Sequence, residues 1–392
     1  MTEPRGGIRR VPVRRVLVCP QEFKGTLGPV EAAATIAAGV RAALRDIGAG
    51  AEVIELPMAD GGPGTVAIVA QATAARLVRH TVTGPLGDPV EATYALLERP
   101  GEPTLAVIEA ASAAGLLLTP VEQRDPARAS SVGVGEQIRH AIASGVRQVI
   151  VGVGGTGTND GGAGAASALG LRLLDPAGAS VPRGGLALVS LARVEADLED
   201  ALRDLDLRIA VDVLNPLLGA TGATAVYGAQ KGVTDWQASA LNAALARWAE
   251  RLRVDLDVDV ASQPGAGAGG GIPTGLLAVC PRGRIESGAA LVADAIGLRA
   301  AIESADLVVT GEGAMDGQTA YGKSVAHVAA LAAAAGTPCI AVAGIVEGLP
   351  AGVLDAEALA PTPADRAAAI AHAAQYATAA ATRLIHRYRA TG

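Results

Sequence analysis

Residues 14–29 read RRVLVCPQEFKGTLGP, and this stretch decides the fold class. Its apolar run, Val16–Cys19, is short and unbroken, which predicts a strand buried on both faces of a parallel sheet. A turn follows, and Pro29 then opens a helical pattern that extends to Ile47, because proline fits the first turn of a helix. A second strand is predicted at Glu52–Leu56, so the chain begins with a β-α-β unit.

Strand and helix signals alternate at both ends of the chain. Near the N-terminus, a further helix is predicted from Thr65 to about Ala75. The pattern returns after residue 286, and the last long segment, Pro363–Arg389, is interpreted as one closing helix. The other elements expected there are a helix at Ala289–Ile296, a strand at Leu307–Thr310, a helix at Ser324–Ala335 and a strand at Cys339–Ala343.

The middle of the chain shows a different pattern, in which short segments of alternating polarity replace the alternation of strands and helices. Leu77–Thr83 and Val90–Leu97 alternate in polarity around Gly84–Pro89, which predicts a hairpin. Further buried strands are expected at Leu105–Ala110, Val146–Val151 and Leu207–Val213. We therefore predict a Rossmann-like, doubly wound α/β domain with a parallel sheet, formed by both chain ends (residues 1–77 and 287–392). A second, mixed α/β domain is expected to be inserted at residues 78–286.

The composition is that of a globular chain with a large core. Hydrophobic residues make up 50% of the 392 residues and charged residues 18%, which excludes an intrinsically disordered chain. The net charge of −7, without a basic block, argues against binding to nucleic acid, because such binding depends on neutralising phosphates. The longest apolar stretches, such as Val328–Ala335, fall far short of the ~20 residues that span a bilayer. No membrane partner is expected.

Cysteine use and the N-terminus indicate the compartment. Cys19, Cys280 and Cys339 are widely spaced, which fits neither a disulfide framework nor a zinc site. The apolar run after the N-terminal arginines is only Val16–Cys19, whereas a secretory signal needs about 7–15 apolar residues. We therefore expect a cytoplasmic protein whose partners are small molecules. The sequence leaves its oligomeric state open.

Lysine is rare in this chain and always lies in a turn. The three lysines are Lys24, Lys231 and Lys323, and every other basic residue counted with them is arginine. Each lysine has a glycine beside it. A compact ammonium can follow a moving phosphoryl group, whereas a planar guanidinium is bulkier and more rigid. The lysines are therefore predicted to bind phosphate or another anion, although the abundance of glycine offers a chance explanation for any one of them.

An Asp-Gly pair recurs after apolar or glycine-rich segments. It occurs at Asp60-Gly61, Asp160-Gly161 and Asp316-Gly317. Ligands of open α/β sheets gather at the carboxyl ends of strands, where glycine turns can offer N–H groups to phosphate oxygens. A carboxylate beside such a turn can hold Mg²⁺ or take a proton from a hydroxyl. Asp-Gly is also a common turn pair, but three such clusters favour a functional site.

Two familiar phosphate motifs are formal matches only. Gly152–Gly157 fits G-x-G-x-x-G, follows an apolar run and has Asp175 about 20 residues further on. The polar stretch Thr158–Gly162 delays the expected helix, so a nicotinamide-dependent oxidoreductase is the less favoured alternative. Gly317–Ser324 fits the Walker A pattern, but the strand predicted before it ends at Thr310, too early for a P-loop. We interpret this segment as a Gly-Lys phosphate turn of another type.

Several motifs occur in one order along the chain, and together they resemble the bacterial glycerate kinase family, the group that makes 2-phosphoglycerate. The resemblance spans about Val16 to Gly344. Motifs in a fixed order are far more specific than any one alone. They are Phe23–Leu27, Ala59–Gly62, Gly154–Gly162, Asn215–Leu217, Gln230–Gly232, Pro264–Gly267, Thr310–Gly313 and Asp316–Lys323.

The resemblance implies both a fold and a reaction. The fold is two α/β domains, one of them Rossmann-like and built from both chain ends. The reaction is transfer of the ATP γ-phosphoryl group to a hydroxyl of D-glycerate in a cleft between the two domains, by positioning and charge neutralisation. Lys24 and Lys323 are expected to contact the transferring phosphate or the substrate carboxylate. Asp60 or Asp160 is expected to deprotonate or orient the hydroxyl.

The remaining site residues are expected to hold metal, phosphate or substrate. By the same resemblance, Glu312 and Asp316 hold Mg²⁺, directly or through water. Which carboxylate is the base and which binds the metal is left open, as is phosphorylation of the 2- or the 3-hydroxyl. The turns and polar groups expected to bind substrate or phosphate are Gly61, Gly62, Gly154, Gly155, Thr156, Asn159, Lys231 and Gly311.

The chain departs from the family pattern at three places. Gln21-Glu22 stands where Asp-Ser is usual, Pro63-Gly64 where Glu-Gly is usual, and Ala314-Met315 where an arginine and an aliphatic residue are usual. If these positions help to place the substrate, the chain uses a different small hydroxy acid or turns over slowly. A catalytically weak binding or sensor protein is the second class of function that these departures leave open.

Overall fold

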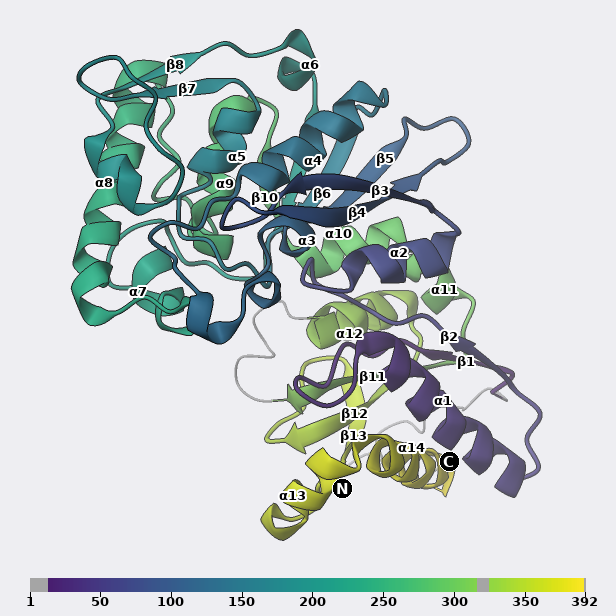
Figure 1. Cartoon of the computed structure of the whole chain (residues 1–392). Coiled ribbons are helices and arrows are strands. Elements are labelled where there is room, and N and C mark those ends of the chain that lie inside the picture. The colour runs from purple at the N-terminus through teal and green to yellow at the C-terminus, as the bar shows by residue number, and fades with distance from the viewer. Residues whose placement is uncertain (1–12, 316–323, 391–392) are drawn as a thin grey trace, which may run out of the picture. The chain divides into compact units, whose positions relative to one another are not determined.

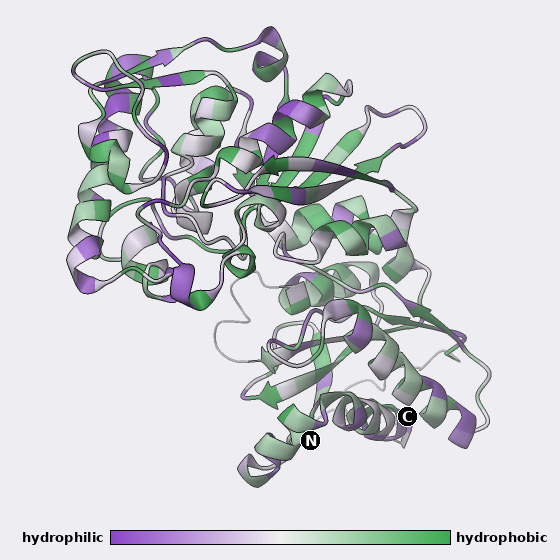
Figure 2. Ribbon diagram, in the orientation of Figure 1, coloured by the Kyte–Doolittle hydropathy of each residue, from purple (hydrophilic) through white to green (hydrophobic). Residues whose placement is uncertain are grey.

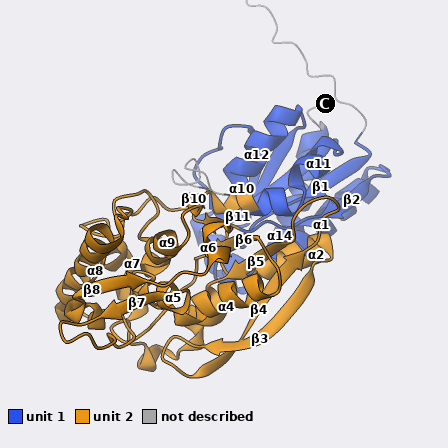
Figure 3. Cartoon of the chain, turned by 90° about the horizontal axis from the view of Figure 1, so that it is seen from above, with its two compact units in different colours: residues 1–59, 292–392 blue, residues 60–291 orange. Residues whose placement is uncertain are grey.

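The computed structural model (Figure 1) describes residues 13–315 and 324–390. The chain divides into two compact units (Figure 3). Unit 1 comprises residues 1–59 and 292–392, and unit 2 comprises residues 60–291. Both ends of the chain therefore contribute to unit 1, and unit 2 is one continuous segment.

Unit 1 is built on a five-stranded sheet in the order β13-β12-β11-β1-β2, in which every neighbouring pair is parallel. Numbered within the unit, this order is 2-1-3-4-5, a doubly wound arrangement with its switch point between β1 and β11. The α/β fold class predicted from the sequence is thereby confirmed. The strands are β1 (Arg15–Val18), β2 (Glu52–Glu55), β11 (Leu307–Met315), β12 (Cys339–Val346) and β13 (Val353–Ala358).

Helices of small residues pack closely in unit 1. In α1 (Pro29–Asp46), proline occupies the first turn, and Ala32, Ile36 and Val40 face the core at helical spacing. A Cβ on Gly39 would come within 2.3 Å of the carbonyl oxygen of Thr378, so glycine lets α14 approach α1. The helices of this unit are α1, α11 (Leu298–Glu303), α12 (Ser324–Ala335), α13 (Arg366–Ala371) and α14 (Ala373–Ala390); η5 (Pro363–Asp365) is a 3₁₀ turn, and α10 (Gly288–Ala295) begins in unit 2.

Three details of unit 1 differ from the sequence prediction. The closing segment is not one helix, because the backbone of His372 leaves the helical region (φ −127°) and separates α13 from α14. The strand predicted to end at Thr310 continues to Met315, pairing with β12 as far as Val346. The predicted strand end at Thr310, which spoke against a P-loop, is therefore wrong. Strand β13 was not predicted.

Unit 2 contains a six-stranded mixed sheet in the order β10-β9-β6-β5-β4-β3. The predicted hairpin is confirmed: β3 and β4 pair antiparallel, and β4 continues antiparallel to β5. Strands β5, β6, β9 and β10 of this sheet are parallel to one another. The strands are β3 (Arg76–Thr83), β4 (Pro89–Leu97), β5 (Leu105–Glu109), β6 (Gln148–Gly152), β9 (Asp206–Ala210) and β10 (Arg284–Glu286), with β7 (Leu171–Leu174) and β8 (Arg193–Ala196) as a separate pair.

Helices and turns complete unit 2 around one hydrophobic core. Tyr94, Ile108 and Trp248 are among its largest buried side chains. Figure 2 shows β5 and β6 as largely hydrophobic, whereas α4 and α8 also carry hydrophilic residues. The helices are α2 (Thr65–Thr73), α3 (Ala111–Ala114), α4 (Val132–Ala143), α5 (Ala163–Ala168), α6 (Asp200–Arg203), α7 (Ala223–Tyr227), α8 (Asp235–Leu256) and α9 (Ala268–Val279); the 3₁₀ turns are η1 (Leu116–Leu118), η2 (Val121–Gln123), η3 (Leu186–Ser190) and η4 (Ala229–Lys231). Among the residues described, no helix combines the length and hydrophobicity needed to cross a membrane.

Candidate functional site

Four parallel strands of unit 2 end at one edge of the sheet. The register pairs Glu109 of β5 with Gly152 of β6, Gly152 with Ala210 of β9, and Ala210 with Glu286 of β10. Open α/β sheets bind their ligands at such an edge, because the loops that leave the strands converge there. A cavity of about 320 Å³ lies at this edge, close to the small end of the range for ligand sites. We call it the carboxyl-edge cavity; its lining includes Asp60, Gly154, Gly155, Thr156, Asp212 and Lys231.

Glycines allow the Asp60 loop to lie against this edge. A Cβ on Gly152 would come within 2.0 Å of the carbonyl oxygen of Gly61. A Cβ on Gly61, whose φ is +88°, would come within 2.8 Å of the Ala210 methyl group. Neither position tolerates a side chain without movement of the backbone. Glycine at both positions therefore brings Asp60 to the ends of β6 and β9, as the Asp-Gly motif predicted, and the Gly62 N–H donates to Asp60 Oδ1 at 3.1 Å.

Two carboxylates, Asp60 and Asp212, interact in this cavity. Asp212 follows β9 and accepts hydrogen bonds from Ser287 Oγ (3.0 Å) and the Gly288 N–H (2.9 Å) on Oδ1. The Ala289 N–H donates to Oδ2 at 3.1 Å. Burial, and next the charge of Asp60, raise the pKa of Asp212 to about 6, although the three hydrogen bonds oppose this.

A buried ammonium faces the same cavity. Lys231 is 2% exposed, and its Nζ donates to the carbonyl oxygen of Thr158 at 2.7 Å. An ammonium has three donors, and this bond uses one of them. Burial lowers the pKa of Lys231 to about 8, and the negative charge of Asp160 opposes that change. A buried cation at the edge of a ligand-sized cavity is suited to bind an anion.

The buried hydroxyl of Thr156 lies beside the glycine turn. Thr156 is 4% exposed, and its Oγ1 has no hydrogen-bond partner within residues 13–315 and 324–390. Buried polar atoms are nearly always hydrogen-bonded, so this hydroxyl is available to a ligand. Gly154 and Gly155 precede it, and the positive φ of Gly155 (+70°) turns the chain at this point. The turn, the hydroxyl and Lys231 together make one wall of the cavity polar.

Asn159 and Asp160 are buried away from this wall. Asp160 is 1% exposed and accepts four hydrogen bonds, from the N–H and Oγ of Ser131 (2.8 and 2.9 Å) and from the N–H groups of Gly162 (3.1 Å) and Gly164 (3.2 Å). Burial raises its pKa, and these bonds oppose the rise. Asn159 donates from Nδ2 to Thr224 Oγ1 at 2.9 Å. Both residues hold the loop that follows the glycine turn, and the catalytic and binding roles expected of them stay predictions.

The other predicted site residues belong to unit 1. Lys24 is exposed, in a loop closed by the pairing of Phe23 with Leu27, and it lines a cavity of about 140 Å³ together with Gly313. A Cβ on Gly311 would come within 2.2 Å of the carbonyl oxygen of Val342, so this glycine serves strand packing. Glu312 is 6% exposed in β11. Asp316 and Lys323 lie outside the described residues.

Sequence reasoning missed Asp212. The segment Leu207–Val213 was taken as an apolar strand, and only aspartates followed by glycine were selected as candidates. The strand ends at Ala210, which leaves Asp212 as the first polar residue beyond its carboxyl end. A carboxylate at that position is the signal that could have identified it. Among the residues described, no cluster of three or more histidine, cysteine or acidic side chains is arranged to hold a metal ion.

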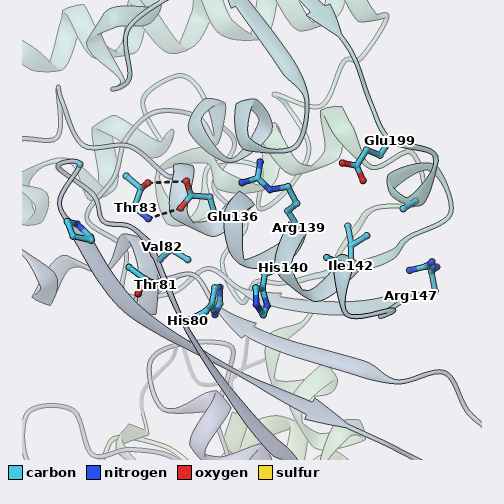
Figure 4. A pocket seen from close by; sticks show the side chains of 14 residues that line it. His80, Thr81, Val82, Thr83, Glu136, Arg139, His140, Ile142, Arg147 and Glu199 are labelled. Atoms are coloured by element: carbon cyan, nitrogen blue, oxygen red, sulfur yellow. Dashed lines mark hydrogen bonds between the residues drawn. The ribbon is translucent and has the colours of Figure 1, made fainter.

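A larger cavity of unit 2, about 960 Å³, lies along the edge strand β3 (Figure 4). We call it the histidine groove because His80 and His140 stack there with ring centroids 4.3 Å apart. Glu136 accepts hydrogen bonds from the N–H (2.7 Å) and the Oγ1 (3.0 Å) of Thr83. Burial, and next the charge of His140, lower the pKa of His80. None of the predicted site residues lines this groove.

Comparison with known proteins agrees with the resemblance noted in the sequence. The model of the glycerate kinase family matches residues 16–389. A glycerate kinase of Bacillus subtilis (strain 168) is 40% identical over 333 residues, which are 85% of this chain and 85% of that protein. The glycerate 2-kinase of Escherichia coli (strain K12) is 39% identical over 331 residues, which are 84% of this chain and 85% of that protein.

A solved structure extends the likeness to the fold. A crystal structure assigned to glycerate kinase 2 from Salmonella typhimurium LT2 matches this chain with a TM-score of 0.81 and 39% sequence identity. The match covers 96% of this chain and 99% of that one. Sequence and fold thus agree over nearly the whole length. The chain belongs to the glycerate kinase family and, with it, to the phosphotransferases that use an alcohol group as acceptor.

Proposed function

We propose that this chain transfers the γ-phosphoryl group of ATP to the 2-hydroxyl of D-glycerate, forming 2-phosphoglycerate. Membership of the glycerate kinase family supports the reaction, and the name of the Escherichia coli relative supports the 2-position. The observation that carries the proposal is the carboxyl-edge cavity, in which a buried ammonium, a hydroxyl with no partner in the described part of the chain and two carboxylates face one small space.

One wall of the cavity suits the carboxylate of the acid. Lys231 supplies a buried positive charge, and Thr156 supplies a hydroxyl without a partner among the described residues. Charge-assisted hydrogen bonds to a carboxylate are roughly twice as strong as those between neutral groups. Binding the acid there would also satisfy the Thr156 hydroxyl. The substrate carboxylate is therefore expected between these two residues, beside the glycine turn.

The reaction also needs a group that accepts a hydrogen bond from the acceptor hydroxyl, and acidic side chains can supply it. Asp60 and Asp212 line the same cavity, and the charge of one acts on the other. Catalysis of phosphoryl transfer depends mostly on positioning and on charge neutralisation. A carboxylate can accept a hydrogen bond from an acceptor hydroxyl and fix the direction of its attack. We assign this positioning to the pair.

We propose that unit 1 supplies the groups for ATP and Mg²⁺. Lys24 lies in the loop after β1, at the switch point of the doubly wound sheet, where such folds bind nucleotides. Glu312 offers a buried carboxylate on β11, and oxygen is the ligand atom that Mg²⁺ prefers. Mg²⁺ would neutralise charge on the phosphates. Asp316 as a second metal ligand and Lys323 as a phosphate contact remain part of the proposal.

An ADP-release assay with glycerate and Mg-ATP tests this function directly. Proton-coupled ³¹P NMR of the product distinguishes the two esters, because the phosphorus of 2-phosphoglycerate couples to one proton on its carbon and that of 3-phosphoglycerate to two. A panel of small hydroxy acids in the same assay tests the acceptor. Glycerate binding without ADP release would identify a binding protein instead.

Replacing Lys24 tests the role of unit 1. Lys24→Ala is expected to lower kcat on the order of 100-fold or more, because a positive charge is lost where the phosphates are expected. Since Lys24 is exposed, circular dichroism and thermal stability should not change. Near-normal turnover of Lys24→Ala would refute its contact with phosphate.

A further inference from the structure

Asp212 is held at the carboxyl-edge cavity by three hydrogen bonds. Its three hydrogen-bond donors, Ser287 Oγ and the N–H groups of Gly288 and Ala289, lie at the start of α10. They hold the carboxylate from one side, and the side chain lines the cavity. Resting on the proposed kinase function, we propose that Asp212 accepts the proton of the acceptor hydroxyl as that hydroxyl attacks the phosphoryl group.

Placement in the cavity separates Asp212 from Asp160. A carboxylate has about four lone-pair sites, two on each oxygen. Asp160 is 1% exposed, accepts three hydrogen bonds on Oδ2 and one on Oδ1, and does not line the cavity. On Asp212, two donors occupy Oδ1 and one occupies Oδ2, which leaves one site on Oδ2. Asp212 can therefore receive a proton without breaking a bond that holds it.

The charges around Asp212 suit a base that works near neutral pH. Asp60 faces it from the loop after β2, and its charge adds to the effect of burial in raising the pKa of Asp212 to about 6. Lys231 from η4 and Tyr227 from α7 line the same cavity. Glu286, at the end of β10, is paired with Arg208 and Arg284. A base with this pKa is ionised at pH 7 and is still basic enough to share a proton in the transition state.

The step balances as a simple displacement. The hydroxyl oxygen of the acid forms a bond to the γ-phosphorus of a nucleoside triphosphate. The bond from that phosphorus to the bridging oxygen breaks, and its electron pair stays on the nucleoside diphosphate. The hydroxyl proton moves to the open site on Asp212 Oδ2. Solvent takes the proton from Asp212 after the product leaves, which restores the carboxylate.

The first test is Asp212→Asn in the full-length protein. We expect kcat to fall about 10²- to 10⁴-fold, as for loss of a general base. The affinity for glycerate, measured by isothermal titration, should change by less than about threefold, because the carboxylate-binding wall is intact. The matched control is Asp204→Asn. Asp204 lies before the same strand β9, exposed and paired with Arg282, and its replacement should leave kcat within about twofold.

A second test keeps the Asp212 carboxylate and moves its pKa. In the wild type, kcat/KM should rise with pH through a limb near pH 6, because the base must be ionised. Asp60→Asn removes a negative charge, so it should shift this limb to lower pH. Ser287→Ala removes a bond that favours the ionised form, so it should shift the limb to higher pH. If Asp212→Asn fails to fold, these two shifts still test whether Asp212 is the base.

The outcomes separate failure of the base from failure of the kinase. An inactive wild type that binds glycerate would overturn the proposed function. Two results with an active wild type would overturn the role of Asp212 alone. One is a kcat of Asp212→Asn within about threefold of the wild-type value. The other is a pH dependence of kcat/KM near pH 6 that neither Asp60→Asn nor Ser287→Ala shifts. Rescue of Asp212→Asn by raising the Mg²⁺ concentration would also overturn it, because the carboxylate would then be a metal ligand.

Discussion

The histidine groove and the carboxyl-edge cavity of unit 2 differ in size and in the charged groups that are buried in them. The histidine groove measures about 960 Å³ and the carboxyl-edge cavity about 320 Å³. In the groove, Glu136 is bonded to Thr83, and Arg139 and Arg147 each donate to a backbone carbonyl, but both ring nitrogens of His80 have no hydrogen-bond partner among the described residues. In the smaller cavity, Thr156 has no partner among the described residues, and Lys231 is buried with one of its three donors bonded to Thr158.

This difference, and not the volume, favours the smaller cavity as the candidate site. Burying a charge or an unpaired hydroxyl costs free energy that a merely structural feature does not repay. Such groups persist where a ligand completes them, and perturbed pKa values gather at the same places. Both cavities hold a buried polar atom without a partner among the described residues, but the carboxyl-edge cavity adds a buried ammonium and two interacting carboxylates, and for this reason we propose it as the site.

Among the tests that compare these two cavities, the largest expected effect comes from the buried ammonium. Lys231→Met keeps the length of the side chain but removes the charge, and kcat/KM for glycerate should fall about 10- to 100-fold, the value of a charge-assisted hydrogen bond. The fall should appear mainly in KM. Arg139→Met in the histidine groove is the matched control and should change kcat/KM by less than about twofold. Equal effects of the two replacements would remove the distinction between the cavities.

Replacing Thr156 is expected to have a smaller effect on glycerate binding and to leave the melting temperature unchanged or slightly higher. Thr156→Val removes a buried hydroxyl that has no partner among the described residues, so the free protein should melt at the same temperature or slightly higher. The affinity for glycerate should fall about 3- to 10-fold, because the acid loses a hydrogen bond. Differential scanning fluorimetry and isothermal titration measure the two effects. Thr81→Val, in the histidine groove, should leave glycerate affinity unchanged; a loss of stability in Thr156→Val would show that the hydroxyl serves the fold.

The smallest effect concerns the pH dependence of stability in the histidine groove. Burial and the charge of His140 lower the pKa of His80, so the folded protein favours the neutral ring. This contribution to the free energy of unfolding is complete above the unfolded pKa of about 6.5 and is lost as the pH falls through the lower folded value. Melting temperatures from pH 7.5 to 5 should therefore fall less steeply in His80→Phe than in the wild type. His372→Phe, at an exposed position, should keep the wild-type slope.

Much of the fold could be predicted from local patterns, and the exceptions have physical reasons. The first β-α-β unit, the hairpin and the buried parallel strands follow from short apolar runs and proline positions. Strand β13 reads VLDAEA and carries too many polar residues to be recognised alone. Glycines 311 and 313 suggest a turn, yet Gly311 lies inside β11 because the Val342 carbonyl leaves no room for a Cβ.

The site could be predicted in part, because glycine-flanked residues are visible in a sequence and spatial pairs are not. Lys231, Thr156 and Asp60 were named from their turns, and they line one cavity. Asp212 has no glycine beside it, and its importance depends on Asp60, which the fold brings near from a distant part of the chain. Asp160 shares the Asp-Gly pattern, but only the structure shows that four donors occupy its carboxylate.

A crystal structure of the full-length protein with D-glycerate would show where the substrate binds. We expect the acid in the carboxyl-edge cavity, with its carboxylate bonded to Lys231 Nζ and Thr156 Oγ1 and a hydroxyl directed at Asp212 Oδ2. Glycerate bound in the histidine groove instead, or bound with its carboxylate away from Lys231, would contradict this expectation.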